Sequence, residues 1–417
     1  MEKNIPENTN MELLKARAKR VNTAIALQEP DRVPLVPTFG NVIAAEYGVT
    51  IKDAMTDQRN LIPALDKMLE DIKPDYFYAP QFFPKNGMDI LKPVNINYPG
   101  KTPQFGDNFT YQTIDHEFLE DEEYEDFLKD PSKFLLQKVL AKKFASLQGL
   151  SMLNPYSLCG STVMGFGALA APPLKQALAS LMEAGNAVGS YIQSSVDVIM
   201  HLVQKGFPVW GTAVALNPFD DFADNIRGLI NTVMDLKTDP ELLAEAVDRY
   251  TDVSIQSAIG LCKMSHADNI FIPLHAGVDE FMSPDDYADY YWPPLKKMLC
   301  AFVNAGITPF VACEGNYFTR LETIKDVPKG KIVYIFEKQD MAKAKKVLGD
   351  TVCIAGNFDT NFLSYGTKES ITEETKRLLD ICAPGGGYMM SNNLAIDNGR
   401  PENLAAWYEA LEKYGRY

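Results

Sequence analysis

A chain of 417 residues, 46% hydrophobic and 23% charged, has the composition of a globular protein with a large core. Barrels of the (β/α)₈ type reach this length as one domain when they carry insertions. Asp and Glu total 55 against 40 Lys and Arg, which gives a formal net charge of −15. Such a surface repels phosphate backbones and anionic membranes, so we expect neither a nucleic acid nor a membrane as partner.

The N-terminal segment and the cysteines indicate a cytoplasmic protein. The first twenty residues are polar and lack the apolar centre of a secretory signal, and no run of 18 uncharged apolar residues occurs. The cysteines lack the paired spacing of a disulfide framework or a zinc motif. They are Cys159, Cys262, Cys300, Cys313, Cys353 and Cys382.

The first half of the chain contains two clear strand signals. Residues 1–28 are predicted to form a helical extension, which precedes an apolar strand at 33–39. A second strand is predicted at 75–80. Residues 100–130 are acidic, aromatic and rich in turn-forming residues, which is typical of an insertion.

The rest of the chain alternates more regularly between strands and helices. A third strand is predicted at 152–160, and helical sequence follows to about residue 206. Residues 208–221 are apolar and then acidic, and suit either a further strand or a loop over the mouth of a barrel. Later apolar strands, each followed by a helix, are predicted at 269–277, 307–315, 331–337, 351–357 and 386–393.

This alternation predicts one (β/α)₈ TIM-barrel domain over residues 1–417. Continuous apolar strands between helices are typical of a parallel sheet buried on both faces, and eight such strands close a barrel. An open doubly wound sheet is the alternative, but no glycine-rich nucleotide motif follows any strand. The eight predicted strand starts are Val33, Asp75, Met152, Asn269, Ile307, Lys331, Thr351 and Gly386.

Functional residues of such barrels lie where the strands end and the following loops begin. The predicted strand ends carry carboxylates, amides, an imidazole and a thiol, which should therefore meet at one mouth. These residues are His275, Asp279, Glu280, Cys313, Glu314, Asn316, Tyr317, Arg320, Glu337, Asp340, Asn357, Asp359, Ser391, Asn392, Asn393, Asp397 and Arg400.

Two neighbours on one strand compete for the inward position. Cys313 and Glu314 must point to opposite faces because side chains alternate along a strand, and we assign Glu314 to the mouth and Cys313 to the core. His275 is either a site residue or a cap of the next helix. Asn357 and Asp359 are either site residues or ordinary turn residues. The glycine run 385–387 suits a tight turn better than a phosphate site.

Several segments carry a family resemblance. They are DRVPLVP at 31–37, MDLKTDPELL at 234–243, KAKKVLGDTVCIAGNFDT at 343–360 and APGGGYMMSNNLAID at 383–397. Together they resemble the uroporphyrinogen decarboxylase superfamily, and especially its branch of cobalamin-dependent methyltransferases. The resemblance implies a (β/α)₈ barrel, in agreement with the count of strands.

The chain departs from both well-known activities of that superfamily. Its decarboxylases carry an arginine-rich segment that grips the substrate's carboxylates, whereas residues 33–40 here contain no arginine. Its thiol methyltransferases bind zinc through a His-x-Cys pair and a later Cys. Ala312, Glu314 and either Asn393 or Leu394 stand at those positions here, so the usual thiolate zinc site is absent.

The motif EGNYFTRL at 314–321 resembles a subgroup that looks like substrate-side methyltransferases. The resemblance implies transfer of a methyl group from a small methylated donor, such as a methyl ether or a methylamine, to a corrinoid held by a partner protein. Glu314, His275 and Asp359 are then the catalytic candidates, and a divalent metal other than zinc held by His275 and Glu314 is an alternative to a protein acid.

The remaining expectations concern binding and assembly. Substrate contacts are expected from Phe39, Tyr78, Asn316, Tyr317, Arg320, Glu337, Asn357, Asn392 and Asn393. Association of two copies as a homodimer is a further expectation. The alternatives are a lyase acting on a carboxylated small molecule or tetrapyrrole, with Arg320 and Arg400 holding carboxylates, and a barrel that binds a ligand or corrinoid protein without catalysis.

Overall fold

The centre of the protein is a closed ring of parallel strands. The computed structural model describes residues 7–393 and 395–417. Five strands pair in parallel in chain order: β5 (Asn269–Leu274), β6 (Thr308–Asn316), β7 (Val333–Lys338), β8 (Cys353–Gly356) and β9 (Tyr388–Met389). A second parallel pair consists of β1 (Phe77–Tyr78) and β4 (Val209–Trp210).

Backbone hydrogen bonds join these two sheets into a barrel. Phe271 of β5 bonds to Ala213 and Ala215, which directly follow β4, at 2.9 and 3.0 Å. On the other side, the segment 33–36 lies between β9 and β1. The Val36 N–H donates to the Met390 carbonyl at 2.8 Å, and the Asp75 N–H donates to the Leu35 carbonyl at 2.8 Å. The ring thus has eight members, and the predicted (β/α)₈ barrel is confirmed.

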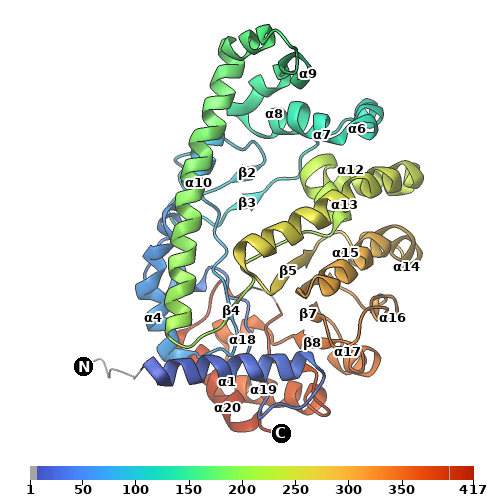
Figure 1. The fold of residues 1–417 in the computed structure, drawn as a ribbon. Helices are drawn as coiled ribbons and strands as arrows, with labels where there is room; N and C mark the ends of the chain where they lie inside the picture. The colour runs from blue at the N-terminus through green and yellow to red at the C-terminus, as the bar shows by residue number, and fades with distance from the viewer. Residues whose placement is uncertain (1–6, 394) are drawn as a thin grey trace.

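Helices surround the ring and cover its outer face (Figure 1). Before β1 they are α1 (Glu7–Ile25), α2 (Val42–Tyr47), α3 (Ile51–Thr56) and α4 (Ile62–Asp71). After β4 they are α11 (Pro218–Phe222), α12 (Leu229–Thr238), α13 (Pro240–Ser265), α14 (Pro284–Asp286), α15 (Trp292–Asn304), α16 (Leu321–Ile324), α17 (Met341–Leu348), α18 (Thr360–Tyr365), α19 (Lys368–Cys382) and α20 (Pro401–Tyr414). No helix in the described part of the chain has the length and apolar character needed to cross a membrane.

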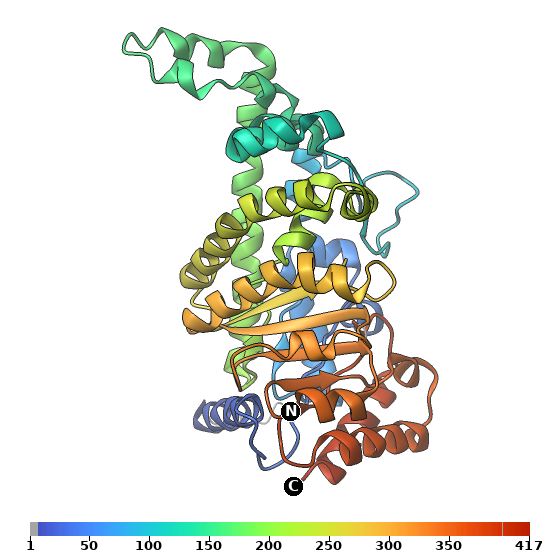
Figure 2. The ribbon, with the colours of Figure 1, turned by 90° about the vertical axis from the view of Figure 1, so that its right-hand side faces the viewer.

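Between β1 and β4 the chain leaves the barrel for about 130 residues and returns along one long helix. This excursion includes the predicted insertion at 100–130 and projects beyond the barrel body (Figures 1 and 2). Its elements are α5 (Lys85–Leu91), the antiparallel pair β2 (Ile96–Asn97) and β3 (Gln112–Thr113), α6 (Tyr124–Lys129), α7 (Pro131–Phe134), α8 (Leu140–Lys143), η4 (Ala145–Met152), α9 (Pro155–Leu158), η5 (Met164–Ala170) and α10 (Pro172–Gln204).

The predicted third strand at 152–160 is wrong. Asn154 accepts a hydrogen bond from the Tyr156 N–H at 3.1 Å and begins the short helix α9 instead. This segment lies in the excursion, where it has no strand to pair with, and Tyr156 is 88% exposed. The third strand is β4, within the stretch at 208–221 for which the sequence left a strand or a loop open.

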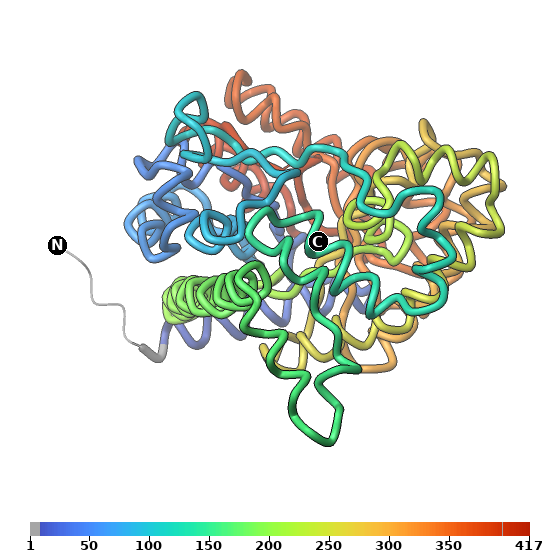
Figure 3. The backbone as a smooth tube through the Cα atoms, turned by 90° about the horizontal axis from the view of Figure 1, so that it is seen from above, coloured from blue at the N-terminus to red at the C-terminus, as the bar shows by residue number. Residues whose placement is uncertain are grey.

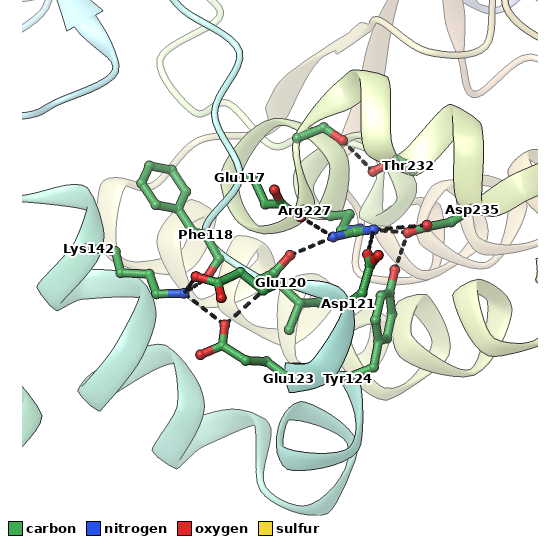
Figure 4. Close-up of polar contacts among 12 residues, drawn as sticks. Glu117, Phe118, Glu120, Asp121, Glu123, Tyr124, Lys142, Arg227, Thr232 and Asp235 are labelled. Atoms are coloured by element: carbon green, nitrogen blue, oxygen red, sulfur yellow. Dashed lines mark hydrogen bonds and ion pairs between the residues drawn. The ribbon is translucent and has the colours of Figure 1, made fainter.

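A buried arginine, Arg227, is among the contacts that fasten the excursion to the helices after β4 (Figure 4). Arg227 donates to Asp235 at 2.7 and 3.0 Å and to the Leu119 carbonyl at 2.8 Å. It also pairs with Glu117 and Asp121, while the Tyr124 hydroxyl donates to the same Asp235. Charge-assisted bonds of this kind hold segments that lie about one hundred residues apart in the sequence.

The barrel interior is filled by its own cluster of side chains. Val21, Ala24 and Ile25 of α1 belong to this cluster, so that α1 closes one end of the barrel. The strands supply Val36, Tyr78, Trp210, Phe310, Val333, Ile335, Cys353, Ala355 and Met389. The alternate residues, such as Val311, Cys313, Tyr334 and Ile354, pack outward against the helices in a larger cluster.

Candidate active site

Strand alternation directs several predicted site residues toward the barrel axis. A residue two or four positions beyond an interior side chain on the same strand faces the same way. Phe271, Phe310, Ile335 and Ala355 all belong to or pack against the interior cluster. The inward residues at the carboxyl ends of β5, β6 and β7 are therefore His275, Glu314 and Glu337, whereas the positive φ of Gly356 (+99°) interrupts the alternation before Asn357.

His275 lies between two carboxylates. Its Nδ1 atom is 2.5 Å from Oδ2 of Asp224, and its Nε2 atom is 3.9 Å from Oε2 of Glu314. The Asp224 contact occupies one ring nitrogen and orients the ring, which leaves Nε2 directed toward Glu314. About half of the Glu314 side chain is exposed, so this face of the imidazole is open to a ligand entering the mouth.

A third carboxylate supports His275 from behind. Asp220 is fully buried and accepts hydrogen bonds from the backbone N–H groups of His275 and Ala276, at 3.1 and 2.9 Å, and from the Tyr291 hydroxyl at 2.6 Å. Burial raises the pKa of Asp220 to about 6, although the charge of His275 and the Tyr291 hydrogen bond oppose that shift. Asp220 therefore fixes the loop that carries His275.

These carboxylates keep the imidazole protonated at neutral pH. Burial by itself lowers the pKa of His275. The hydrogen bond that Nδ1–H donates to Asp224 and the charges of Asp220, Asp224 and Glu314 outweigh burial and raise the pKa to about 9. The Nε2–H group is thus a proton donor that faces the mouth.

Glu314 takes the inward position, and its neighbour Cys313 takes the core position, as predicted. Cys313 is buried outside the barrel, and burial raises the pKa of its thiol well above the usual value. The pKa of Glu314 is also raised, by partial burial and by the charges of Glu337, Asp220 and Asp224, against the opposing effect of His275. The Glu337 carboxylate accepts a hydrogen bond from the Gly315 N–H, with 2.6 Å between the nitrogen and Oε2.

An aromatic floor lies inside the barrel beneath these polar groups. The Trp210 ring lies 4.8 Å from Tyr78 and 4.7 Å from Phe310, and Tyr78 lies 5.4 Å from Phe271. Burial first, and then the charges of Tyr111 and Glu314, raise the pKa of Tyr78. Tyr111 of the excursion packs on Phe83, with ring centroids 4.2 Å apart. Phe39 is buried against Phe77 in the cluster outside the barrel, so its predicted substrate contact is corrected.

Two other predicted site residues, Arg320 and Tyr317, have structural roles away from the mouth. Arg320 is buried, and its guanidinium binds the carbonyls of Gly277, Val278 and Met282 and pairs with Asp279. Tyr317 is buried beside Tyr287 on the outer side of the strands. The predicted substrate contacts of these two residues are therefore corrected, because burial removes both from the mouth.

The remaining predicted residues are mostly bound to neighbouring loops. Asp359 accepts from the Asn361 N–H at 2.9 Å and caps α18, and Asn357 donates to the Gln339 carbonyl at 3.0 Å. Asn392 bonds to Thr38, Asn393 accepts from the Thr360 N–H, and Asn316 donates to Glu280. Leu394 lies outside the described residues. Asp359 is thus a helix cap, while Glu337, Asn357, Asp359 and Asn393 also line a polar cavity of about 520 Å³ beside β7 and β8.

The donor set falls short of a metal site. His275 Nε2 and Glu314 are two donors, whereas a catalytic metal usually has three protein ligands. Within residues 7–393 and 395–417, no group of three or more His, Cys, Asp or Glu side chains has the arrangement needed to hold a metal ion. We therefore derive no catalytic step through a metal.

Asp220, Asp224 and Tyr291, which orient His275 and its loop, were missed by the sequence analysis. Asp220 and Asp224 follow the true third strand by about ten residues, in the motif NPFDDFAD. They would have been candidates by the strand-end rule if that strand had been placed at 209–210.

Comparisons with known proteins agree with the fold. The sequence model of the uroporphyrinogen decarboxylase family matches residues 166–414. Uroporphyrinogen decarboxylases of Chlorobaculum tepidum and Chlorobaculum parvum are 36% and 34% identical over 100 residues, which is 24% of this chain and only 28% of each relative. A solved methyltransferase from Methanosarcina mazei superimposes with a TM-score of 0.64 at 16% identity, over 95% of this chain and 98% of that one. This likeness shows a common fold.

Proposed function

This chain belongs to the uroporphyrinogen decarboxylase family, and from that premise we propose that it transfers the methyl group of a small methyl ether to a corrinoid held by a partner protein. The observation that carries the proposal is the protonated His275, oriented by Asp224 and open toward Glu314 above an aromatic floor. The motif resemblance to methyltransferases and the fold shared with one support it.

An ether needs the proton that His275 offers. The reaction breaks the bond between the methyl carbon and the ether oxygen, and the oxygen keeps the bonding electron pair. His275 Nε2 delivers its proton to that oxygen, so a neutral alcohol or phenol leaves. The corrinoid supplies a reduced cobalt that accepts the methyl group. A quaternary ammonium donor would leave as a neutral amine without a proton, and so would not use this group.

The remaining residues of the mouth select and position the donor. Asp224 is a positioning residue that keeps Nδ1 hydrogen-bonded, and the floor formed by Tyr78, Trp210 and Phe310 offers an apolar surface that excludes water. The carboxylates of Asp224, Glu314 and Glu337 repel an anionic donor. An uncharged, preferably aromatic, methyl ether fits this mouth best.

Decarboxylation is the second candidate, because the relatives that match 100 residues of this chain are uroporphyrinogen decarboxylases. A tetrapyrrole with several carboxylates needs several cations to bind it. Residues 33–40 contain no arginine, and Arg320 is bound internally. These observations favour methyl transfer over decarboxylation.

The test mixes the purified protein with a corrinoid protein in the Co(I) state and one donor at a time. The donors are an uncharged aryl methyl ether, its carboxylated analogue and a tetramethylammonium salt, and the readout is the absorbance change from Co(I) to methyl-Co(III). We expect the uncharged ether to react fastest. His275→Gln should lower kcat about a hundredfold or more, whereas Cys313→Ala should stay within about twofold because this side chain faces the core.

Two outcomes would overturn the proposal. One is the absence of methyl-Co(III) with every donor while a carboxylated tetrapyrrole releases carbon dioxide. The other is full activity of His275→Gln with the uncharged ether, which would show that no proton from this residue is used.

A further inference from the structure

The polar cavity beside β7 and β8 adjoins the mouth at Glu337 and extends away from it toward α19. Its volume of about 520 Å³ lies within the range of about 300–1,000 Å³ that is usual for small-molecule sites. Its walls are the loop between β7 and α17, the loop between β8 and α18, and one side of α19. Figures 2 and 3 show these orange-red helices at the opposite end of the molecule from the tip of the excursion.

The cationic side chains that line this cavity, Arg377 and Lys338, each lie beside a carboxylate. Arg377 donates two hydrogen bonds to Glu374, from Nε and from Nη2, and each is 2.7 Å long. Nζ of Lys338 lies 3.9 Å from Oε1 of Glu337. An anionic ligand would therefore compete with carboxylates that already neutralise both cations.

The other two carboxylates of the cavity, Asp340 and Asp359, are helix caps. Asp340 accepts hydrogen bonds from the N–H groups of Ala342 and Lys343 at 2.9 and 3.1 Å, and Asp359 accepts one from the Asn361 N–H at 2.9 Å. These backbone groups already stabilise the two negative charges, so neither needs a cation as partner. Each cap uses Oδ1, and within the described residues Oδ2 makes no hydrogen bond, so that Oδ2 remains an acceptor for a ligand.

The cavity also offers a hydrogen-bond donor and an apolar surface. Nη1 of Arg377 makes no hydrogen bond within residues 7–393 and 395–417, so it can donate to an oxygen of a ligand. Phe362, Met341 and Ile381 line the same cavity, although most of its lining residues are polar or charged. This combination suits a ligand with many hydroxyl groups around a ring whose C–H groups can pack on an aromatic side chain.

We propose that this cavity binds an uncharged, polyhydroxylated small molecule of the size of a monosaccharide. A hydroxyl group both donates and accepts, so it can bond to the free oxygens of Asp340 and Asp359 and to Nη1 of Arg377 without breaking an ion pair. A charged ligand would find no unpaired opposite charge in the cavity and would lose its hydration. The proposal goes beyond methyl transfer and does not depend on it.

The first experiment measures binding to the full-length protein by isothermal titration and saturation-transfer NMR, at slightly acidic pH and without a methyl donor or a corrinoid. The probes are D-glucose, D-galactose and D-mannose, each compared with its positively charged 2-amino derivative and its negatively charged uronic acid. We expect at least one uncharged sugar to bind with a dissociation constant in the millimolar range or tighter. Its two charged derivatives should bind at least about tenfold more weakly.

The second experiment locates the binding site with variants. Arg377→Gln should weaken binding of the best sugar at least about tenfold, because it removes a charged hydrogen-bond donor. Lys376→Gln is the matched control, since Lys376 precedes Arg377 on α19 but lies over the Tyr414 ring, 5.2 Å from its centroid, and outside the cavity. Ala342→Trp removes no side-chain bond, and its indole should block the cavity from the exposed start of α17 and abolish binding.

Three outcomes would overturn the proposal. The first is that no uncharged sugar binds, and the second is that an amino sugar or a uronic acid binds more tightly than its parent sugar. The third is equal binding by the wild type, Arg377→Gln and Ala342→Trp, which would place the ligand elsewhere on the protein. None of these outcomes concerns methyl transfer, because the measurement contains neither a methyl donor nor a corrinoid.

Discussion

At the scale of single residues, the charge state of His275 follows from its neighbours more than from its own chemistry. Burial lowers the pKa of an imidazole, yet three nearby carboxylates reverse that effect and raise it to about 9. The folded-state pKa thus lies above the unfolded value of about 6.5. Protonation of His275 therefore stabilises the fold fully below about pH 6.5 and loses this effect as the pH rises through 9.

Asp224→Asn should lower the pKa of His275, because it removes the charge that is hydrogen-bonded to Nδ1. The high-pH fall in kcat, which follows loss of the His275 proton, should then move to lower pH. An NMR titration of the imidazole measures the pKa without any partner protein. Asp221→Asn is the matched control, since Asp221 bonds to Asn225 and Tyr250 and not to His275. An unchanged titration in Asp224→Asn would contradict this account of the proton donor.

At the scale of elements, the glycine run before β9 shows how a short motif determines a turn. Gly385, Gly386 and Gly387 have φ values of +80°, +74° and +67°, which confirms the tight turn predicted for them. Gly386 has a second constraint, because a Cβ atom there would lie 2.3 Å from the carbonyl carbon of Gln28. The turn therefore packs directly on the loop that follows α1.

Gly386→Ala should destabilise the protein more than Gly385→Ala does. Both substitutions force alanine into the left-handed region, which costs about 1–2 kcal/mol. Only Gly386→Ala also meets the Gln28 backbone, which adds roughly 1–3 kcal/mol, whereas a Cβ at Gly385 meets nothing within 4 Å. Urea unfolding of the two variants measures the difference in the free energy of unfolding. Equal losses would show that the close approach to Gln28 is not maintained.

At the scale of the whole molecule, one buried carboxylate connects the two ends of the chain to the barrel. Asp75 accepts hydrogen bonds from Arg32 at 2.6 Å and from the Leu35 N–H at 2.8 Å, and it pairs with Arg20 of α1. Arg32 also pairs with Glu412 of α20 at 2.6 Å. The first strand segment, α1 and α20 are thus joined at the start of β1.

Asp75→Asn should lower the free energy of unfolding by about 3–5 kcal/mol, because it removes the buried negative charge that the guanidinium groups of Arg20 and Arg32 share. Asp31→Asn removes an exposed carboxylate from the same Arg20, and this surface pair should contribute less than about 1 kcal/mol. Thermal and urea unfolding of both variants checks the comparison. Similar small losses would show that Asp75 does not hold these elements together.

The sequence by itself determined the barrel class, the positions of the five later strands and the inward position of Glu314 beside the buried Cys313. These follow from local rules, because each of the five predicted segments is a mostly apolar run of seven to nine residues and neighbours on a strand must alternate. The location of β4 did not follow, since the stretch at 208–221 is apolar and then acidic, a pattern that suits a loop as well as a strand.

Only the tertiary structure decided which polar residues meet. His275 and Asp224 are 51 positions apart, and their contact depends on how β4 and β5 join in the ring. Arg320 carries the positive charge expected of a residue that binds a carboxylated substrate. However, the loop after β5 folds over it, and its guanidinium donates to a carbonyl of that loop. Local propensity predicts neither effect. Closure of the barrel places distant loops side by side, and these neighbours determine the burial and charge of each site residue.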